Sequence, residues 1–210
     1  LFDPDAPPAP LRAQLGIPTD ALLLLYCGTI GMAQDVGLLA RAAALAPPAL
    51  RLHVVVVGDG VERQKVADEV TALGVGATVH LLPSVPRREV PGLLAAADVG
   101  AVILRDDPAF AGYLPSKIFE IMAMRRPIVL GVRGEAQQLV EGAGAGLAFA
   151  PGDPRDLLAR LRSFADLGPD GRADMGRRAR DYVLAHHDRD RQALDLAAFL
   201  ERLLARDRVR

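Results

Sequence analysis

Strand-like and helix-like segments alternate along this chain, and this alternation constrains the fold more than any other feature of the sequence. Apolar runs rich in Val, Ile and Leu predict buried strands at 21–27, 52–57, 78–82, 99–104, 127–132 and 146–150. Helical spacing of apolar residues predicts helices at 32–46, 61–73, 84–97 (after an initial turn), 115–124, 134–141 and 153–166. Strands that are apolar on both faces belong to parallel sheets covered by helices on both sides. We therefore expect an α/β fold with a doubly wound, parallel, six-stranded Rossmann-like sheet.

Three regions are expected along the chain. Residues 1–20 are interpreted as the remnant of a linker between two domains, because they are rich in Pro and the chain does not begin with Met. Residues 21–168 are expected to form the Rossmann-like domain, and residues 169–210 to form C-terminal helices. The last of these helices carries an apolar stripe, which suits either docking onto a preceding domain or an ordinary face within this one. The stripe comprises Leu196, Phe199, Leu200 and Leu203.

Composition excludes several classes of function. The formal net charge of −1 argues against a surface built for nucleic acid or for an anionic membrane. The single cysteine, Cys27, excludes an intramolecular disulfide and fits a reducing compartment, so we expect a cytoplasmic location. The longest apolar run, 21–27, is too short to cross a bilayer, which takes about 20 residues. No spacing of Cys and His indicates a metal site, and no cofactor is expected.

The loops that follow the predicted strands are the expected place for a ligand. In an open parallel sheet, ligands bind at the carboxyl ends of the strands, near the point where the strand order reverses. These loops are rich in Gly, Pro and small polar residues, and two of them run into helix N-termini, which are suited to phosphate. They are 28–35, 58–62, 83–89, 105–117 and 131–137.

The segment "LPSKIFEIMAMRRPIV" (114–129) places two charges at the start of an otherwise apolar helix. A lysine in the first turn opposes the helix dipole, which suggests that Lys117 serves a ligand. A pyrophosphate could bind the Ser116 hydroxyl and the Lys117 ammonium, and Glu120, one turn on, could accept hydrogen bonds from a sugar diol. The alternative is an exposed ion pair between Lys117 and Glu120, worth a few tenths of a kcal/mol.

Helical spacing also divides this segment into two faces. The predicted ligand face comprises Lys117, Glu120, Ile121 and Met124. The predicted core face comprises Ile118, Phe119 and Met122.

Five stretches in this order resemble a known family. They are "LYCGTIG", "VVVVGDGVERQKV", "VHLLPSVPRREVPGLLAAADVGAVIL", "LPSKIFEIMAMRRPIV" and "GVRGEAQQLVEGAGAGLAFAPGDPRDLLARL". Together they resemble the C-terminal, donor nucleotide-sugar-binding domain of group 1 (GT4-like) glycosyltransferases, the C-terminal half of a GT-B fold. Among subgroups, the chain is most similar to bacterial enzymes that build cell-surface polysaccharides. The resemblance implies transfer of a sugar from a UDP- or GDP-sugar to an acceptor in polysaccharide or glycoconjugate synthesis, with retention of configuration and without a metal ion.

The resemblance also implies roles for individual residues. Glu120 matches the glutamate that holds the ribose hydroxyls, and Ser116 and Lys117 lie beside the pyrophosphate. The turn Gly28–Thr29–Ile30–Gly31 allows the backbone to approach the phosphates. The segment Leu82–Val85 brackets the base through Pro83, Ser84 and Val85, and Tyr113 and Arg133 are further donor-binding candidates.

In this family the acceptor, a sugar or a lipid-linked sugar, binds an N-terminal domain that would precede Leu1, and the catalytic residue usually lies there too. The present chain is therefore expected to bind a donor but to be inactive alone. Such an enzyme could lie peripherally at the inner face of the plasma membrane, although no membrane contact is evident in these residues.

Two departures from the family pattern keep other functions open. Gly112 stands where many members have a second Glu, eight residues before the ribose-binding one, and Ile30 and Gln34 stand where positive charges are common. Phosphate binding would then depend more on Lys117 and Arg133. The alternatives are a non-catalytic GT-B-like scaffold or sensor and a sugar-nucleotide 2-epimerase, whereas the glycine pattern speaks against a nicotinamide-dependent dehydrogenase.

Overall fold

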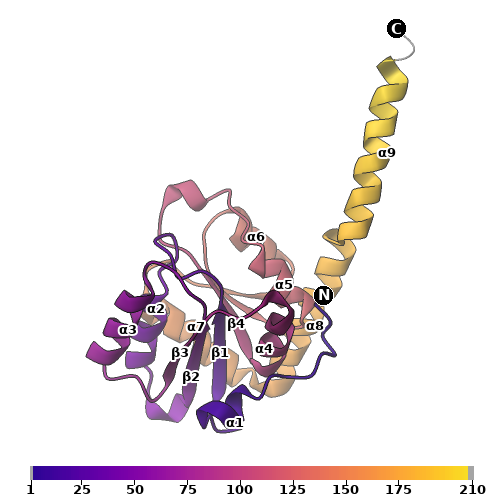
Figure 1. The fold of residues 1–210 in the computed structure, drawn as a ribbon. Helices are drawn as coiled ribbons and strands as arrows, with labels where there is room; N and C mark the ends of the chain where they lie inside the picture. The colour runs from indigo at the N-terminus through magenta and orange to yellow at the C-terminus, as the bar shows by residue number, and fades with distance from the viewer. Residues whose placement is uncertain (1, 208–210) are drawn as a thin grey trace.

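Six parallel strands form one twisted sheet at the centre of the protein (Figure 1). The computed structural model describes residues 2–207, with the side chains of all but 189, 190, 195 and 203–207. The strands are β1 (Leu22–Cys27), β2 (Leu52–Val57), β3 (Val79–Leu82), β4 (Val99–Ile103), β5 (Ile128–Gly131) and β6 (Gly146–Ala148). Their order is β3-β2-β1-β4-β5-β6, so the order reverses between β1 and β4. The predicted α/β, doubly wound, six-stranded fold is confirmed.

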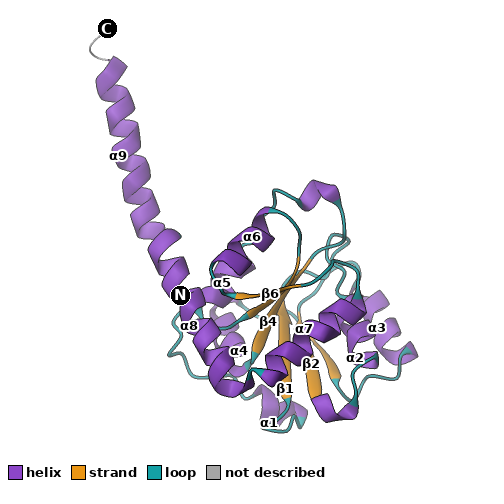
Figure 2. Cartoon of the chain, turned by 180° about the vertical axis from the view of Figure 1, so that it is seen from behind, coloured by secondary structure: helices purple, strands orange, loops and turns teal. Residues whose placement is uncertain are grey.

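Helices cover both faces of the sheet (Figure 2). One layer contains α1 (Leu11–Leu15), α4 (Val90–Ala96), α5 (Lys117–Ala123), α6 (Glu135–Gly142) and α8 (Gly168–His186). The other contains α2 (Gly37–Ala44), α3 (Arg63–Ala72) and α7 (Pro154–Asp166). Short 3₁₀ turns lie at η1 (Pro48–Leu50), η2 (Arg87–Glu89) and η3 (Pro108–Phe110), and α9 (Arg189–Asp207) ends the described chain.

Strand β1 shows why the apolar runs are continuous. Leu23 and Leu25 are buried under the first layer, and Leu24 and Tyr26 are buried under the second. Because successive side chains of a strand point to opposite faces, a sheet covered on both sides buries every residue of its central strands. Apolar and polar residues therefore do not alternate along these strands, as is typical of a sheet covered by helices on both faces.

The predicted helix at 32–46 is wrong at its start, because α2 begins only at Gly37. Residues 28–36 form a loop that backbone hydrogen bonds hold against neighbouring loops. Ile30 is fully buried and donates its N–H to the carbonyl of Asp59 over 2.8 Å, while Met32 is exposed. The apolar residues before Gly37 thus fall at helical spacing by chance and do not form a helix.

Residues 2–20 pack against the sheet domain. Leu11 and Ile17 are buried, and Arg12 forms an ion pair with Asp98 at 2.7 Å. At the other end, α8 packs closely on α5, where a side chain at Gly176 would overlap the Arg125 carbonyl. Residues 2–20 and helix α8 thus both contact the sheet domain, and the expected division into three regions stays a prediction.

Helix α9 extends away from the rest of the protein (Figure 1). Its exposed apolar side chains include Leu194, Leu196, Phe199 and Leu200. The predicted Leu203 of the stripe lies outside the described side chains, and docking of this helix onto a further domain stays a prediction. Within the described residues, no helix combines the length and the apolar character that a membrane span needs.

Candidate functional site

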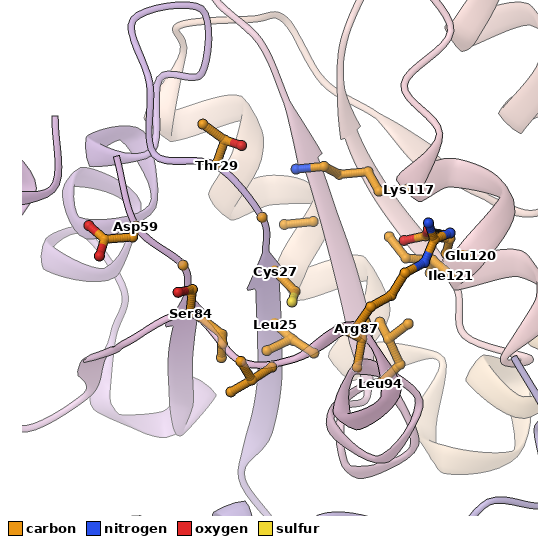
Figure 3. Close-up of a pocket in the computed structure, with 16 residues that line it drawn as sticks. Leu25, Cys27, Thr29, Asp59, Ser84, Arg87, Leu94, Lys117, Glu120 and Ile121 are labelled. Atoms are coloured by element: carbon orange, nitrogen blue, oxygen red, sulfur yellow. Dashed lines mark hydrogen bonds and ion pairs between the residues drawn. The ribbon is translucent and has the colours of Figure 1, made fainter. Parts of the chain in front are cut away.

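A cavity of about 540 Å³ opens at the carboxyl ends of β1 and β2, beside the N-terminal end of α5. It lies at the reversal of strand order, where ligands bind to sheets of this kind. Its polar and charged lining residues come from four loops or helices, and Figure 3 shows most of them converging on one space. They are Thr29, Asp59, Ser84, Arg87, Lys117 and Glu120. A second pocket of about 280 Å³ shares Gly28, Thr29, Lys117 and Glu120 with the first.

The floor of the cavity is made of backbone from the loops after β1 and β2. Gly28 donates its N–H to the Val57 carbonyl over 2.9 Å. A Cβ at Gly58 would overlap the carbonyl oxygen of Gly28, so the two loops touch without side chains between them. This close approach explains the glycines in "GDG", since a Cβ at Gly60 would likewise overlap the carbonyl oxygen of Ile30.

Arg105, which follows β4, fixes the outer part of the loop after β1. Its Nε donates to the Met32 carbonyl, its backbone N–H donates to the Ala33 carbonyl over 2.9 Å, and its guanidinium pairs with Glu62 at 3.0 Å. The pKa of Glu62 is lowered, because Lys65 and Arg105 outweigh the effect of desolvation. Three loops are thereby joined through one guanidinium.

Lys117 extends from the first turn of α5 into the cavity (Figure 3), and its ammonium lies over the aromatic ring of Tyr26. Its Nζ lies 4.1 Å from the ring centre, a distance suited to a cation–π interaction. Among the described residues no carboxylate pairs with this ammonium, and burial lowers the pKa of Lys117 to about 8. A desolvated cation that forms no ion-pair contact favours an anionic ligand.

Glu120 pairs with Arg87 and not with Lys117. The Arg87 Nη2 atom donates to Glu120 Oε1 over 2.8 Å, from the 3₁₀ turn η2 across to α5. The exposed Lys117–Glu120 ion pair that the spacing allowed is therefore not formed. Arg87 is a site residue that sequence reasoning missed, and the only available signal was that it lies in the loop 83–89, which follows β3.

The predicted site residues are brought together in part. Gly28, Thr29, Ser84, Val85, Lys117 and Glu120 line the larger cavity, and Tyr113 and Ser116 line the smaller pocket. Gly31 lies further along the loop, with its N–H donating to Gln34 over 3.2 Å. Pro83 lines a separate groove near α1. Arg133 is exposed and pairs with Asp106 at 3.0 Å, so its assignment to a ligand stays a prediction.

The two predicted faces of α5 need correction. Met124, placed on the ligand face, is fully buried, and Ile121 is also buried while touching the cavity. Phe119, placed on the core face, is half-buried and packs on His187 at the end of α8, with ring centres 4.7 Å apart. The cause is that α5 lies between the sheet and α8, so it is covered from two sides.

The structure shows what surrounds two of the positions that depart from the family pattern, Gly112 and Ile30. Gly112 lies in an exposed loop, and a side chain there would meet no atom within 4 Å. Ile30 anchors its loop in the core. Within the described part of the chain, no group of three His, Cys, Asp or Glu side chains could hold a metal ion.

The family profile for glycosyl transferases group 1 matches residues 9–182. The chain belongs to the group 1 glycosyl transferases. This match covers the sheet, the cavity and most of α8, and it agrees with the resemblance carried by the five ordered stretches.

Two curated relatives extend this finding. The chain is 34% identical to a D-inositol 3-phosphate glycosyltransferase from Kineococcus radiotolerans, over 85% of this chain and 44% of the relative. It is 33% identical to a protein of the same name from Thermomonospora curvata, over 74% of this chain and 37% of the relative. The chain thus spans less than half the length of these curated relatives.

Two solved structures show the same fold. HepE from Anabaena, solved in complex with UDP and glucose, matches with a TM-score of 0.78 and 24% identity, over 95% of this chain and 55% of that one. The C-terminal domain of the group 1 family protein LpcC from Francisella tularensis matches with a TM-score of 0.69 and 16% identity. That match covers 89% of this chain and 98% of the domain. The group 1 chain therefore has the fold of one half of a GT-B enzyme.

Proposed function

We propose that this chain is the donor-binding half of a retaining, metal-independent glycosyltransferase that takes its sugar from a UDP- or GDP-sugar. The observation that carries the proposal is Lys117, a half-buried ammonium with no described carboxylate partner. It lies at the carboxyl end of β1, one helical turn from Glu120. A cation in this place is stabilised by a bound anion and destabilised without one.

A nucleoside diphosphate fits the order of groups along the cavity. The diphosphate would bind at Lys117, over the exposed backbone of Gly28 and Thr29, with the Ser116 hydroxyl at its edge. Glu120 would accept hydrogen bonds from the ribose hydroxyls. The base would then lie toward Ser84 and Val85 on the opposite wall.

UDP is the first donor nucleotide to test, because HepE, a structural neighbour, was solved with UDP and glucose. The acceptor is proposed to bind a part of the protein outside this chain. A cell-surface sugar or lipid-linked sugar is one candidate acceptor. A phosphorylated cyclitol is a second candidate acceptor, because the curated relatives are named D-inositol 3-phosphate glycosyltransferase.

The decisive experiment is calorimetric titration of the chain with UDP, GDP and ADP. We expect one of them to bind and Glu120→Ala to weaken it about tenfold or more, because hydrogen bonds to a charged group are lost. Glu135→Ala, an exposed carboxylate on α6 outside the cavity, is the matched control. Binding that is unchanged by Glu120→Ala, or no binding at all, would favour the scaffold or sensor function.

A further inference from the structure

We infer that Arg87 is a positioning residue for Glu120, holding its carboxylate in the orientation that recognises a ribose diol. The inference rests on the proposed function and adds to it a specificity-determining pair at the mouth of the cavity. The two side chains come from different walls, one from η2 after β3 and one from α5 (Figure 3).

The contact uses one oxygen of the carboxylate. Arg87 donates to Glu120 Oε1, and the second oxygen, Oε2, accepts no hydrogen bond from a described residue. Glu120 has three rotatable bonds before its carboxylate, so without a partner it would adopt several orientations. The contact with Arg87 selects one of them and leaves an acceptor available for a ligand.

Arg87 itself is held from two sides. Its guanidinium carbon lies 5.8 Å from the centre of the Phe2 ring, within the range of a cation–π contact. The Arg87 side chain is 65% exposed and that of Glu120 is 24% exposed, so the pair lies at the mouth of the cavity with the carboxylate inward. Phe2 belongs to the N-terminal segment, which is thereby linked to the orientation of Glu120.

The Arg87–Glu120 pair also affects the balance of charge in the cavity. Glu120 and Asp59 are the acidic lining residues, and Lys117 and Arg87 are the basic ones. A diphosphate bound at Lys117 would lie one helical turn from Glu120, and two like charges a few ångströms apart repel by more than about 1 kcal/mol at a protein surface. Arg87 offsets the Glu120 charge, so the glutamate can approach the ribose without repelling the phosphates.

The test compares the affinities of UDP and 2′-deoxy-UDP, because this ratio reports on the ribose hydroxyl and not on general stability. We expect the unmodified chain to prefer UDP by about tenfold, the size expected for one hydrogen bond to a charged group. Glu120→Gln should remove most of this preference. Arg87→Ala should reduce it to about threefold or less, and Arg87→Lys should restore part of it.

Two controls make the result specific. Arg88→Ala changes the next residue of the same turn, whose nearest carboxylate is Glu89 at 4.0 Å, and should leave both affinities within twofold. In the double variant Arg87→Ala, Glu120→Gln, the loss of preference should be no larger than in Glu120→Gln alone, because both changes act through one carboxylate. Thermal melting of each variant confirms that it folds.

The outcomes separate the inference from the proposed function. If UDP binds and Glu120→Gln removes the preference while Arg87→Ala retains it, donor binding stands and the inference is overturned. If Arg87→Ala tightens UDP binding, the ion pair blocks the ribose and the inference is likewise overturned. If the unmodified chain binds neither nucleotide, the proposed function fails and the inference fails with it.

Discussion

The ammonium of Lys117 lies 4.1 Å from the centre of the Tyr26 ring, and a Cβ at Gly28 would come within 2.8 Å of the same nitrogen. The lysine is therefore confined between an aromatic ring and bare backbone. Tyr26 is itself fixed, because its hydroxyl donates to the Thr29 carbonyl over 2.6 Å. This arrangement holds a positive charge in a desolvated place, which costs stability and prepares the site for an anion.

Lys117→Met should stabilise the fold and weaken nucleotide binding. Removing the desolvated charge should raise the free energy of unfolding at pH 7 by about 1 kcal/mol, or roughly 2–4 °C in Tm. The affinity for UDP should fall about tenfold or more, because a charge-assisted contact is lost. Thermal melting and calorimetry measure the two effects, and a variant less stable than the parent at pH 7 would contradict the first.

The stability gain from Lys117→Met should depend on pH in a defined window. Folding lowers the pKa of Lys117 from 10.5 to about 8, because burial penalises the charged form. The folded state therefore binds fewer protons than the unfolded state between these values, and stability from this group rises with pH across them. The difference in Tm between parent and variant should be largest below pH 8 and should shrink toward pH 10.5, as melting at a series of pH values would show.

Donor binding should weaken at alkaline pH. UDP-glucose suits this test because its phosphates are diesters and do not titrate near neutrality. Affinity should be constant below pH 7 and should fall as the pH rises above 8, where the free protein loses the Lys117 proton. Lys117→Met should give a flat profile over the same range, and an equal decline in that variant would assign the pH dependence to another group.

The sheet could be predicted from sequence because burial on both faces leaves uninterrupted apolar runs such as "LLLLYC" and "LHVVVV". The loop after β1 could not. Its conformation depends on backbone hydrogen bonds between Ile30 and Asp59 and on the guanidinium of Arg105. Such contacts join residues far apart in the chain and leave no periodic pattern.

The candidate site, too, could be predicted from sequence only where its residues lie close together in the chain. Lys117 and Glu120 are close in sequence and share a helix, so their spacing indicated a site. Arg87 is 33 residues from Glu120, and nothing in its local sequence distinguishes it from Arg88. The difference between these neighbours is produced by the tertiary structure, which directs one toward α5 and leaves the other 79% exposed.

Gly28→Ala should damage the site more than the same change at Gly112 would. Gly28 has φ of 147°, and a Cβ there would press on the Lys117 Nζ at 2.8 Å. We expect a loss of about 1–3 kcal/mol in the free energy of unfolding, because alanine is strained at this φ, and weaker UDP binding because the lysine is displaced. Gly112→Ala is the matched control, since open space surrounds it, and urea denaturation should show little change there.

Arg105→Ala should loosen the loop after β1 with little effect on global stability. Exposed ion pairs contribute less than about 1 kcal/mol, but this guanidinium also binds the Met32 carbonyl and the Glu62 carboxylate. Limited proteolysis should therefore cut near 31–35 faster in the variant, and UDP affinity should fall severalfold. Arg177→Ala removes a comparable exposed pair on α8, with Asp174, and should leave both measurements unchanged.

The floor of the cavity and one of its walls differ in how freely they can be changed. The floor is backbone packed on backbone around Gly28 and Gly58, whereas one wall is a single short stretch, 84–90, between the edge strand β3 and α4. We expect that stretch to tolerate exchange between homologous chains, provided that Arg87 is retained. For protein engineering, the proposed donor site would then combine a fixed backbone floor with one wall that can be varied by grafting libraries of recognition loops.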